Sequence, residues 1–203
     1  MVADDPSLNE DASAQVAHAI STHAVQTEFD FYTAVDDWNQ NEHAGAGMLG
    51  TIEFNSSTLY RYANVAVHEF MRKVGSVEAV INALSLFVKA FANSLPTGKV
   101  ATFANQTLPE ALLVSIRTDR PVSLVSAYEE PIKSKQGYVK ASVKRLLEEL
   151  HKADKFLEPA QVNILLSLDQ NEFNDDIYEV MTLNDLLDNV SQELKTMLTE
   201  VGD

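Results

Sequence analysis

The residue types that could carry chemistry in this sequence begin with three glycines, Gly45, Gly47 and Gly50, spaced as G-x-G-x-x-G. A dinucleotide-binding loop of that spacing needs a strand before it and a helix after it, so that pyrophosphate lies on the helix N-terminus. Here the polar residues 39–43 precede the glycines, and the β-branched Thr51 and Ile52 follow Gly50. We therefore predict a flexible hinge at these glycines and not a nucleotide site.

A second motif, Pro96-Thr97-Gly98-Lys99, ends in the Gly-Lys of a phosphate-binding loop but lacks its first glycine. The following Val100-Ala101 has no hydroxyl that could ligate magnesium, as the loop normally requires. Lys99 could still contact a phosphate as a single charge.

The candidates for metal binding are also incomplete. His18 and His23 are five residues apart, which places them on opposite faces of a strand and is poor for one metal. A second set of candidate ligands, between residues 36 and 43, could supply hard oxygen ligands to a metal ion, but the spacing of these residues matches no known calcium loop. These residues are Asp36, Asp37, Glu42 and His43.

Catalytic patterns are equally weak. The run Asn55-Ser56-Ser57 lacks a nucleophile elbow, and none of the five histidines has a recognisable nucleophile–base spacing. The sequence therefore favours a protein that is not an enzyme, with no cofactor and no bound metal.

The aromatic pair Phe31-Tyr32 lies in a long segment, residues 24–48, that has no stable periodicity. Aromatic residues on such a segment either cap a core or stack on nucleic-acid bases. Composition alone favours the core cap, because the neighbouring acidic residues suit a nucleic acid badly. A loop of this length inside a compact domain is usually functional or mobile.

The composition indicates a globular protein. The chain has 203 residues, 45% of them hydrophobic and 22% charged, which is too apolar for a disordered acidic tail. The absence of cysteine excludes disulfides, thiolate zinc sites, iron–sulfur clusters and cysteine nucleophiles. No apolar run approaches the ~18 residues of a membrane span, and residues 1–15 do not resemble a signal peptide. We expect one soluble domain in the cytoplasm, without membrane contact.

The formal net charge of −15 is unevenly distributed. Residues 1–60 have a net charge of −10, residues 61–150 of +4 and residues 151–203 of −9. Only the middle segment could meet a polyanion, and its densest basic group is either a phosphate patch or the solvated face of a helix, the second being the commoner case. The group consists of Lys133, Lys135, Lys140, Lys144 and Arg145.

Hydrophobic periodicity predicts helices over Val77–Asn93, residues 139–157 and residues 183–201, the last with Thr182 as a possible cap and Asp185 as its acidic partner. Strands are predicted over residues 15–23, 49–55, 58–67 and 112–116, the second and third forming a hairpin. An acidic, poorly ordered loop is expected near residues 169–179. The order of these elements indicates an α+β fold with a mainly antiparallel sheet, of which the β-β-α-β part resembles half of a ferredoxin-like (RRM-like) unit.

Three stretches of the sequence resemble a known family. They are Ala17-His18-Ala19-Ile20-Ser21-Thr22-His23, Phe31-Tyr32-Thr33-Ala34-Val35-Asp36-Asp37, and the run from Gly50 to Asn64. Together with Leu95-Pro96-Thr97-Gly98-Lys99 and residues 111–125, they resemble the backbone subunit of the type I-E CRISPR Cascade complex, the CasC family. The resemblance covers all 203 residues, which would form about the C-terminal half of such a subunit.

The resemblance implies a palm with a ferredoxin-like sheet, a thumb inserted at residues 24–49 and a helical part at residues 139–203. Copies of such a subunit line up along a CRISPR RNA (crRNA), and each thumb presses between bases and kinks the guide, which leaves segments free to pair with target DNA in antiviral defence. Other Cascade subunits are further partners. By position, the family's guide-contacting residues fall on Met1, Phe31, Tyr32, Thr33, Val35 and Leu49.

Two features depart from the family. Its basic guide-binding segment belongs to the N-terminal half, so we expect the 203-residue fragment alone to bind RNA weakly or not at all. Its sheet would also have an unpaired edge. The alternative from another class is an acidic protein–protein interaction module that never touches RNA, and a metal-dependent nuclease that uses Asp36 and Asp37 is a more distant one.

Overall fold

The computed structural model describes residues 11–35, 46–168 and 177–200, with no account of the side chains at residues 34–35, 46–48 and 200. Met1, Gly45, Asp36, Asp37, Glu42 and His43 lie outside the described residues, and so does most of the acidic loop expected near residues 169–179. The fold is α+β, as the sequence predicted, with small antiparallel pairings and a long C-terminal helix.

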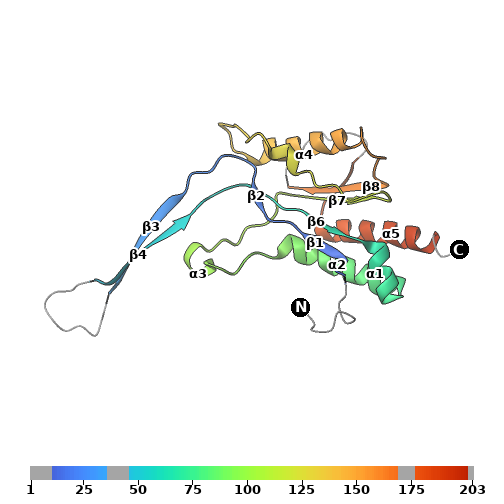
Figure 1. Cartoon of the computed structure of the whole chain (residues 1–203), viewed down its shortest axis with the longest axis horizontal. Helices are drawn as coiled ribbons and strands as arrows, with labels where there is room; N and C mark the ends of the chain where they lie inside the picture. The colour runs from blue at the N-terminus through green and yellow to red at the C-terminus, as the bar shows by residue number, and fades with distance from the viewer. Residues whose placement is uncertain (1–10, 36–45, 169–176, 201–203) are drawn as a thin grey trace.

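A long two-stranded ribbon forms the first third of the chain (Figure 1). Its two arms run antiparallel throughout, and backbone hydrogen bonds such as Ala17 N to Tyr62 O (2.9 Å) and Thr22 N to Thr58 O (2.9 Å) join the paired segments. The pairs are β1 (Ala14–Val16) with β6 (Ala63–Val65), β2 (Ile20–Ser21) with β5 (Leu59–Tyr60), and β3 (Glu28–Val35) with β4 (Ala46–Phe54).

This pairing corrects two expectations from the sequence. Residues 49–55 and 58–67 do not form a hairpin with each other, because β4 pairs with β3 while β5 and β6 pair with β2 and β1. The expected loop at residues 24–48 contains the strand β3 and the start of β4. Alternation of apolar and polar residues predicts a strand that packs one face on a core. The strand β3 projects away from the body (Figure 1), so its sequence does not carry this signal.

A second sheet of three strands forms the centre of the body. Its strands are β7 (Ala111–Ile116), β8 (Val162–Ser167) and β9 (Tyr178–Val180) in that order, with β7 antiparallel and β9 parallel to β8. The strand predicted at residues 112–116 is confirmed, whereas β8 and β9 were not predicted. The run Ile164-Leu165-Leu166 was the available signal for β8, since a strand buried on both faces has no alternation.

The three long helices match the prediction closely. They are α2 (Val77–Asn93), α4 (Val139–Ala153) and α5 (Leu183–Glu200). The Thr182 cap is confirmed: its Oγ1 accepts a hydrogen bond from the Asp185 backbone N–H (3.1 Å) and donates one to Asp185 Oδ2 (2.7 Å). Three short elements were not predicted from the sequence: α1 (Val67–Val74), α3 (Val100–Phe103) and the 3₁₀ helix η2 (Val125–Tyr128).

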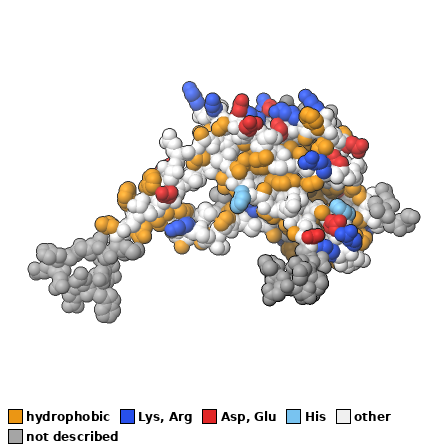
Figure 2. Space-filling model, viewed as in Figure 1, with side chains coloured by type: hydrophobic (Ala, Val, Ile, Leu, Met, Phe, Trp, Pro, Cys, Tyr) orange, Lys and Arg blue, Asp and Glu red, His pale blue; other side chains and the backbone are white. Residues whose placement is uncertain are grey.

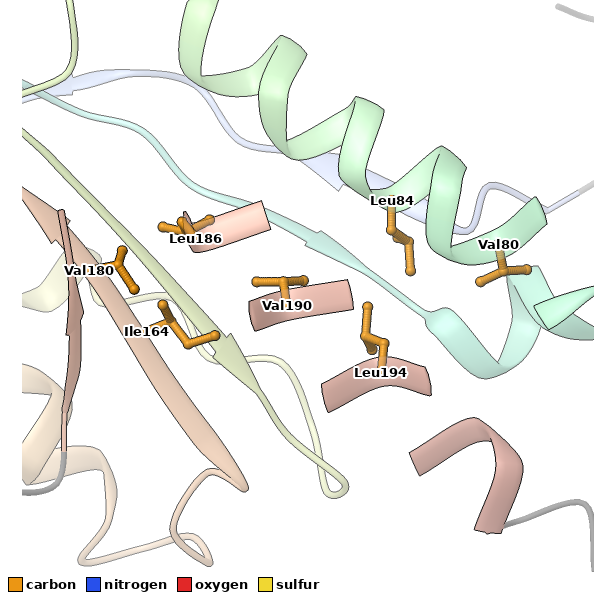
Figure 3. Close-up of a cluster of buried hydrophobic side chains, with 7 residues drawn as sticks. All are labelled: Val80, Leu84, Ile164, Val180, Leu186, Val190 and Leu194. Atoms are coloured by element: carbon orange, nitrogen blue, oxygen red, sulfur yellow. The ribbon is translucent and has the colours of Figure 1, made fainter. Parts of the chain in front are cut away.

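Two hydrophobic cores lie on opposite faces of this sheet. Ile164 of β8 packs with residues of α2 and α5, and the adjacent Leu165 packs with residues of α4; both are fully buried. Figure 3 shows the first core, in which Val190 and Leu194 of α5 lie towards α2, with its Val80 and Leu84, and Leu186 of α5 lies beside Ile164 and Val180 of the sheet. The body is therefore a layered structure with helices on both sides of the sheet (Figure 1). Among the described residues, no helix is both long and apolar enough to cross a membrane.

Candidate functional site

The strands β3 and β4 form a hairpin that projects from the body (Figure 1). Phe31 lies opposite Thr51, Tyr32 opposite Gly50, and Thr33 opposite Leu49. Side chains of directly opposed residues share a face of an antiparallel pair, and successive residues alternate between faces. The hairpin therefore has a Phe31 face (Phe29, Phe31, Thr33, Leu49, Thr51 and Glu53) and a Tyr32 face (Glu28, Asp30, Tyr32, Gly50, Ile52 and Phe54).

The Phe31 face presents large apolar side chains to solvent. Phe31 is 78% exposed, Leu49 76% and Phe29 56%. Figure 2 shows hydrophobic side chains along this projecting part of the molecule. Isolated exposed apolar residues are ordinary, but several that share one face of a projecting element mark a contact surface.

The Tyr32 face is arranged differently, because the Tyr32 ring lies across the backbone of Gly50. A Cβ atom at residue 50 would stand 2.3 Å from Cζ of Tyr32, so no other residue type fits without moving the ring. At the base of the same face, the rings of Phe54 and Phe103 have centroids 5.4 Å apart, which attaches the hairpin to α3. This face supports the hairpin, and the other remains free for contact.

The structure brings together only some of the residues that the sequence singled out. Phe31, Thr33 and Leu49 share one face, whereas Tyr32 points to the other, so the expected aromatic pair does not act from a single surface. Val35 lies at the end of β3, where the register shifts after Ala34. The core cap favoured by composition alone is wrong for Phe31, given its exposure.

Lys99 and the glycine motif lie in settings that differ from a phosphate loop. Lys99 precedes α3 with a φ of 61°, and Ala104 after α3 has a φ of 49°. Both values belong to the left-handed region that non-glycine residues rarely adopt. Gly47 and Gly50 lie inside β4, so the hinge predicted there is wrong for these two residues.

The ribbon meets the body at what we call the root, residues 20–24 and 58–60. The Tyr60 hydroxyl accepts a hydrogen bond from the backbone N–H of Leu124 (3.0 Å), and its ring lies 5.4 Å from that of Tyr128. Burial raises the pKa of Tyr60 and that of Tyr128 above the ordinary tyrosine value, so both phenols stay protonated. The sequence predicts no role for Tyr60 or Tyr128, because their aromatic character is the only signal that they carry.

Basic side chains gather over α4 and the segment before it (Figure 2). A hollow of about 270 Å³ there is lined by Ile132, Lys133, Ala141, Lys144, Arg145 and Glu148. Lys144 is well exposed and lies 4.0 Å from Glu148, one helical turn further on. This pairing is typical of a solvated helix face. The exposed side chain of Lys133 also lines the hollow, so the same surface could contact phosphates.

The described residues contain no group of three or more side chains suited to hold a metal ion. The two histidines considered for a metal differ in their surroundings: His18 is exposed, while both ring nitrogens of His23 meet backbone groups of the ribbon. The acidic candidates at positions 36, 37 and 42 fall outside the described residues.

Taken together, these features define an α+β protein that carries a projecting hairpin with one free apolar face. The chain belongs to the family of CT1975-like proteins, whose sequence model matches residues 1–191. A comparison of the sequence with curated proteins gave no match.

Two solved structures are similar over almost the whole chain. A chain of a "CRISPR RNA-guided surveillance complex" is 28% identical, with a TM-score of 0.85 over 95% of this chain and 75% of its own length. A chain of a "CRISPR RNA-guided surveillance complex, pre-nicking" is 27% identical, with a TM-score of 0.88 over 96% of this chain and 53% of its own length. The present chain thus spans about three quarters of the first and half of the second.

Proposed function

We propose that this chain is a non-catalytic structural subunit of a Cascade-type CRISPR surveillance complex, and that the Phe31 face of its hairpin contacts the bases of the guide RNA. Membership of the CT1975-like family and similarity to chains of two RNA-guided surveillance complexes support the first part. The observation that carries the second is the exposure of Phe31 and Leu49 on one face of a projecting hairpin.

The charge of the hairpin favours bases over phosphates as its target. Its described residues include Glu28, Asp30 and Glu53 and no lysine or arginine, so phosphates would be repelled. An apolar surface can replace the stacking that is lost when a base step opens, and every base offers a π-face to an aromatic ring. The phosphate backbone would instead meet the basic residues of the middle segment, such as Lys99 and Lys133.

The finer assignment follows from the resemblance to the type I-E CasC family. In this proposal copies of the subunit assemble along one crRNA with other Cascade subunits, the RRM-like palm holds the backbone of the guide, and the hairpin acts as the thumb that kinks it. The opened segments then pair with target DNA. Tyr32 supports the wedge from behind, and Thr33 flanks Phe31 on the contacting face.

The test compares guide binding by the parent subunit, assembled in its complex, with guide binding by a double variant that combines Phe31→Ala and Leu49→Ala. We expect guide affinity to fall by about 5- to 150-fold, or ordered assembly to be lost, since stacking of one base on an aromatic side chain contributes about 1–3 kcal/mol. Phe156→Ala is the matched control, because Phe156 is 92% exposed and lies beyond the far end of α4 from the root.

Two results would contradict the proposal. Unchanged guide binding in the double variant would remove the hairpin from the RNA interface. If the double variant instead lost a protein partner while binding RNA normally, the Phe31 face would be a protein contact, as expected of an acidic interaction module.

A further inference from the structure

His23 lies at the root of the ribbon and uses both ring nitrogens to hold it. Nε2 lies 3.1 Å from the backbone nitrogen of Thr58, on the opposite arm, and Nδ1 lies 2.8 Å from the carbonyl oxygen of Ala24, on its own arm. A backbone N–H can only donate and a carbonyl can only accept. Nε2 must therefore be the bare nitrogen and Nδ1 must carry the hydrogen, which is the neutral Nδ1–H tautomer.

The same ring is fastened to the body. It stacks on the ring of Tyr138, the residue that precedes α4, with centroids 3.7 Å apart and planes inclined by 11°. Such a contact fixes the plane of the imidazole as well as its position. His23 thus connects the two arms of the ribbon to the start of one helix.

The neighbouring Thr22 reinforces this connection. It is 2% exposed, and its hydroxyl is hydrogen bonded to that of Ser142 in α4 at 2.8 Å. Its carbonyl oxygen accepts a hydrogen bond from the backbone N–H of Ile132 (2.9 Å). The two residues together fasten the root to α4 and to the segment before it, whereas the described hairpin beyond the root is mostly exposed.

We infer that His23 is a positioning residue that, clamped on Tyr138, fixes the direction in which the Phe31 face projects. The hairpin is a long lever, since Val35 comes twelve positions after His23 in the chain, which is up to ~40 Å at ~3.3 Å per residue. A rotation of about 5° at the root would move the far end by up to about 3.5 Å, close to the ~3.4 Å between successive bases of a strand. The role of this direction in base contact depends on the function proposed above, but the clamp itself does not.

The test measures the direction of the hairpin in the 203-residue chain without RNA. The chain has no cysteine, so Thr51→Cys on the hairpin and Gln192→Cys on α5 can carry two spin labels with no other labelling site. Both positions are exposed. Pulsed electron paramagnetic resonance then gives the distribution of distances between hairpin and body.

We expect a narrow distribution for the parent chain and one at least twice as wide for His23→Ala. Tyr138→Ala should widen it in the same way, while Tyr138→Phe, which keeps the ring, should restore the parent width. His68→Ala is the matched control, because His68 is highly exposed on α1 and should leave the width unchanged.

The inference is overturned if His23→Ala keeps the parent width. If His23→Ala does not fold, as judged by circular dichroism, the Tyr138 variants decide, and equal widths for Tyr138→Ala and Tyr138→Phe overturn it. Because no RNA is present, failure here would leave the proposed base contact intact. Conversely, unchanged guide binding in the variant that combines Phe31→Ala and Leu49→Ala would contradict the proposed base contact and leave the clamp intact.

Discussion

The hairpin and the body use the same kinds of apolar side chain for opposite purposes. In the body, Ile164 and Leu165 are fully buried between two helical layers. On the hairpin, Phe31 and Leu49 are 78% and 76% exposed. Burial of a large apolar side chain stabilises a fold by about 1.5–3 kcal/mol, and the two hairpin residues contribute little of that to this chain.

The difference shows that separate requirements determine the residue types of the two regions. The body residues are determined by packing inside the chain, so replacing them should cost stability. The hairpin residues on the Phe31 face have no such role, so replacing them should cost contact with a partner while the fold persists. Variants that separate stability from binding therefore test the comparison directly.

The largest expected effect is in the body. Ile164→Ala should lower the free energy of unfolding by about 2–5 kcal/mol, because it leaves a cavity in a fully buried site. Phe31→Ala should change it by less than about 0.5 kcal/mol, as for an exposed position. Urea unfolding followed by circular dichroism measures both, and a larger loss for Phe31→Ala than for Ile164→Ala would refute the distinction between the regions.

A smaller and local effect is expected within the hairpin. Gly50→Ala forces the far end of the Tyr32 ring away from the backbone. Because this ring is 37% exposed and can turn towards solvent, we expect a cost of about 0.5–1.5 kcal/mol, that of an unfavourable rotamer. Hydrogen exchange of the β3 and β4 amides should become faster while exchange in α2 and α5 is unchanged. Gly98→Ala is the matched control, since a Cβ there meets no atom within 4 Å; equal exchange in the two variants would show that Tyr32 does not depend on Gly50.

The smallest effect is expected at the end of the body sheet, where Arg117 binds Asp119 in a bidentate ion pair (2.9 and 3.0 Å). The hydrogen bonds from Arg117 lower the pKa of Asp119 from 3.8 to about 2. The folded state thus favours the charged carboxylate, so the pair stabilises the fold above about pH 4 and loses this effect as the pH falls towards 2. Asp119→Asn should therefore be less stable than the parent at pH 6 and approach it at pH 2.5 in urea unfolding; a constant difference would contradict this linkage.

The body could largely be predicted from the sequence, because its helices bury one face and so repeat apolar residues every three or four positions. Val77–Asn93 is predicted to the residue, and the Thr182 cap follows from the side-chain type three positions before Asp185. The strand β8 was missed because a strand buried on both faces carries no alternation, and a run such as Ile164-Leu165-Leu166 also fits other elements.

The hairpin could be predicted less well, for a physical reason. Its pairing is set by backbone hydrogen bonds between β3 and β4. A hairpin that projects from the body and packs neither face on a hydrophobic core leaves no hydrophobic period in the sequence. The resemblance to a family pointed to Phe31, Tyr32, Thr33 and Leu49, but only the register shows that Tyr32 faces away from the other three. The role of His23 in holding the root has no sequence signal, since it depends on Thr58 and Tyr138.

The central claim is that one face of the hairpin touches bases, and photo-crosslinking in the assembled complex tests it most directly. A photoreactive amino acid would replace Leu49 on the Phe31 face, Ile52 on the Tyr32 face or Phe156 at the far end of α4, each in a separate variant. We expect position 49 to crosslink to nucleobases of the guide, with much weaker crosslinking from position 52 and none from position 156. Equal crosslinking from positions 49 and 156, or none from position 49, would contradict it.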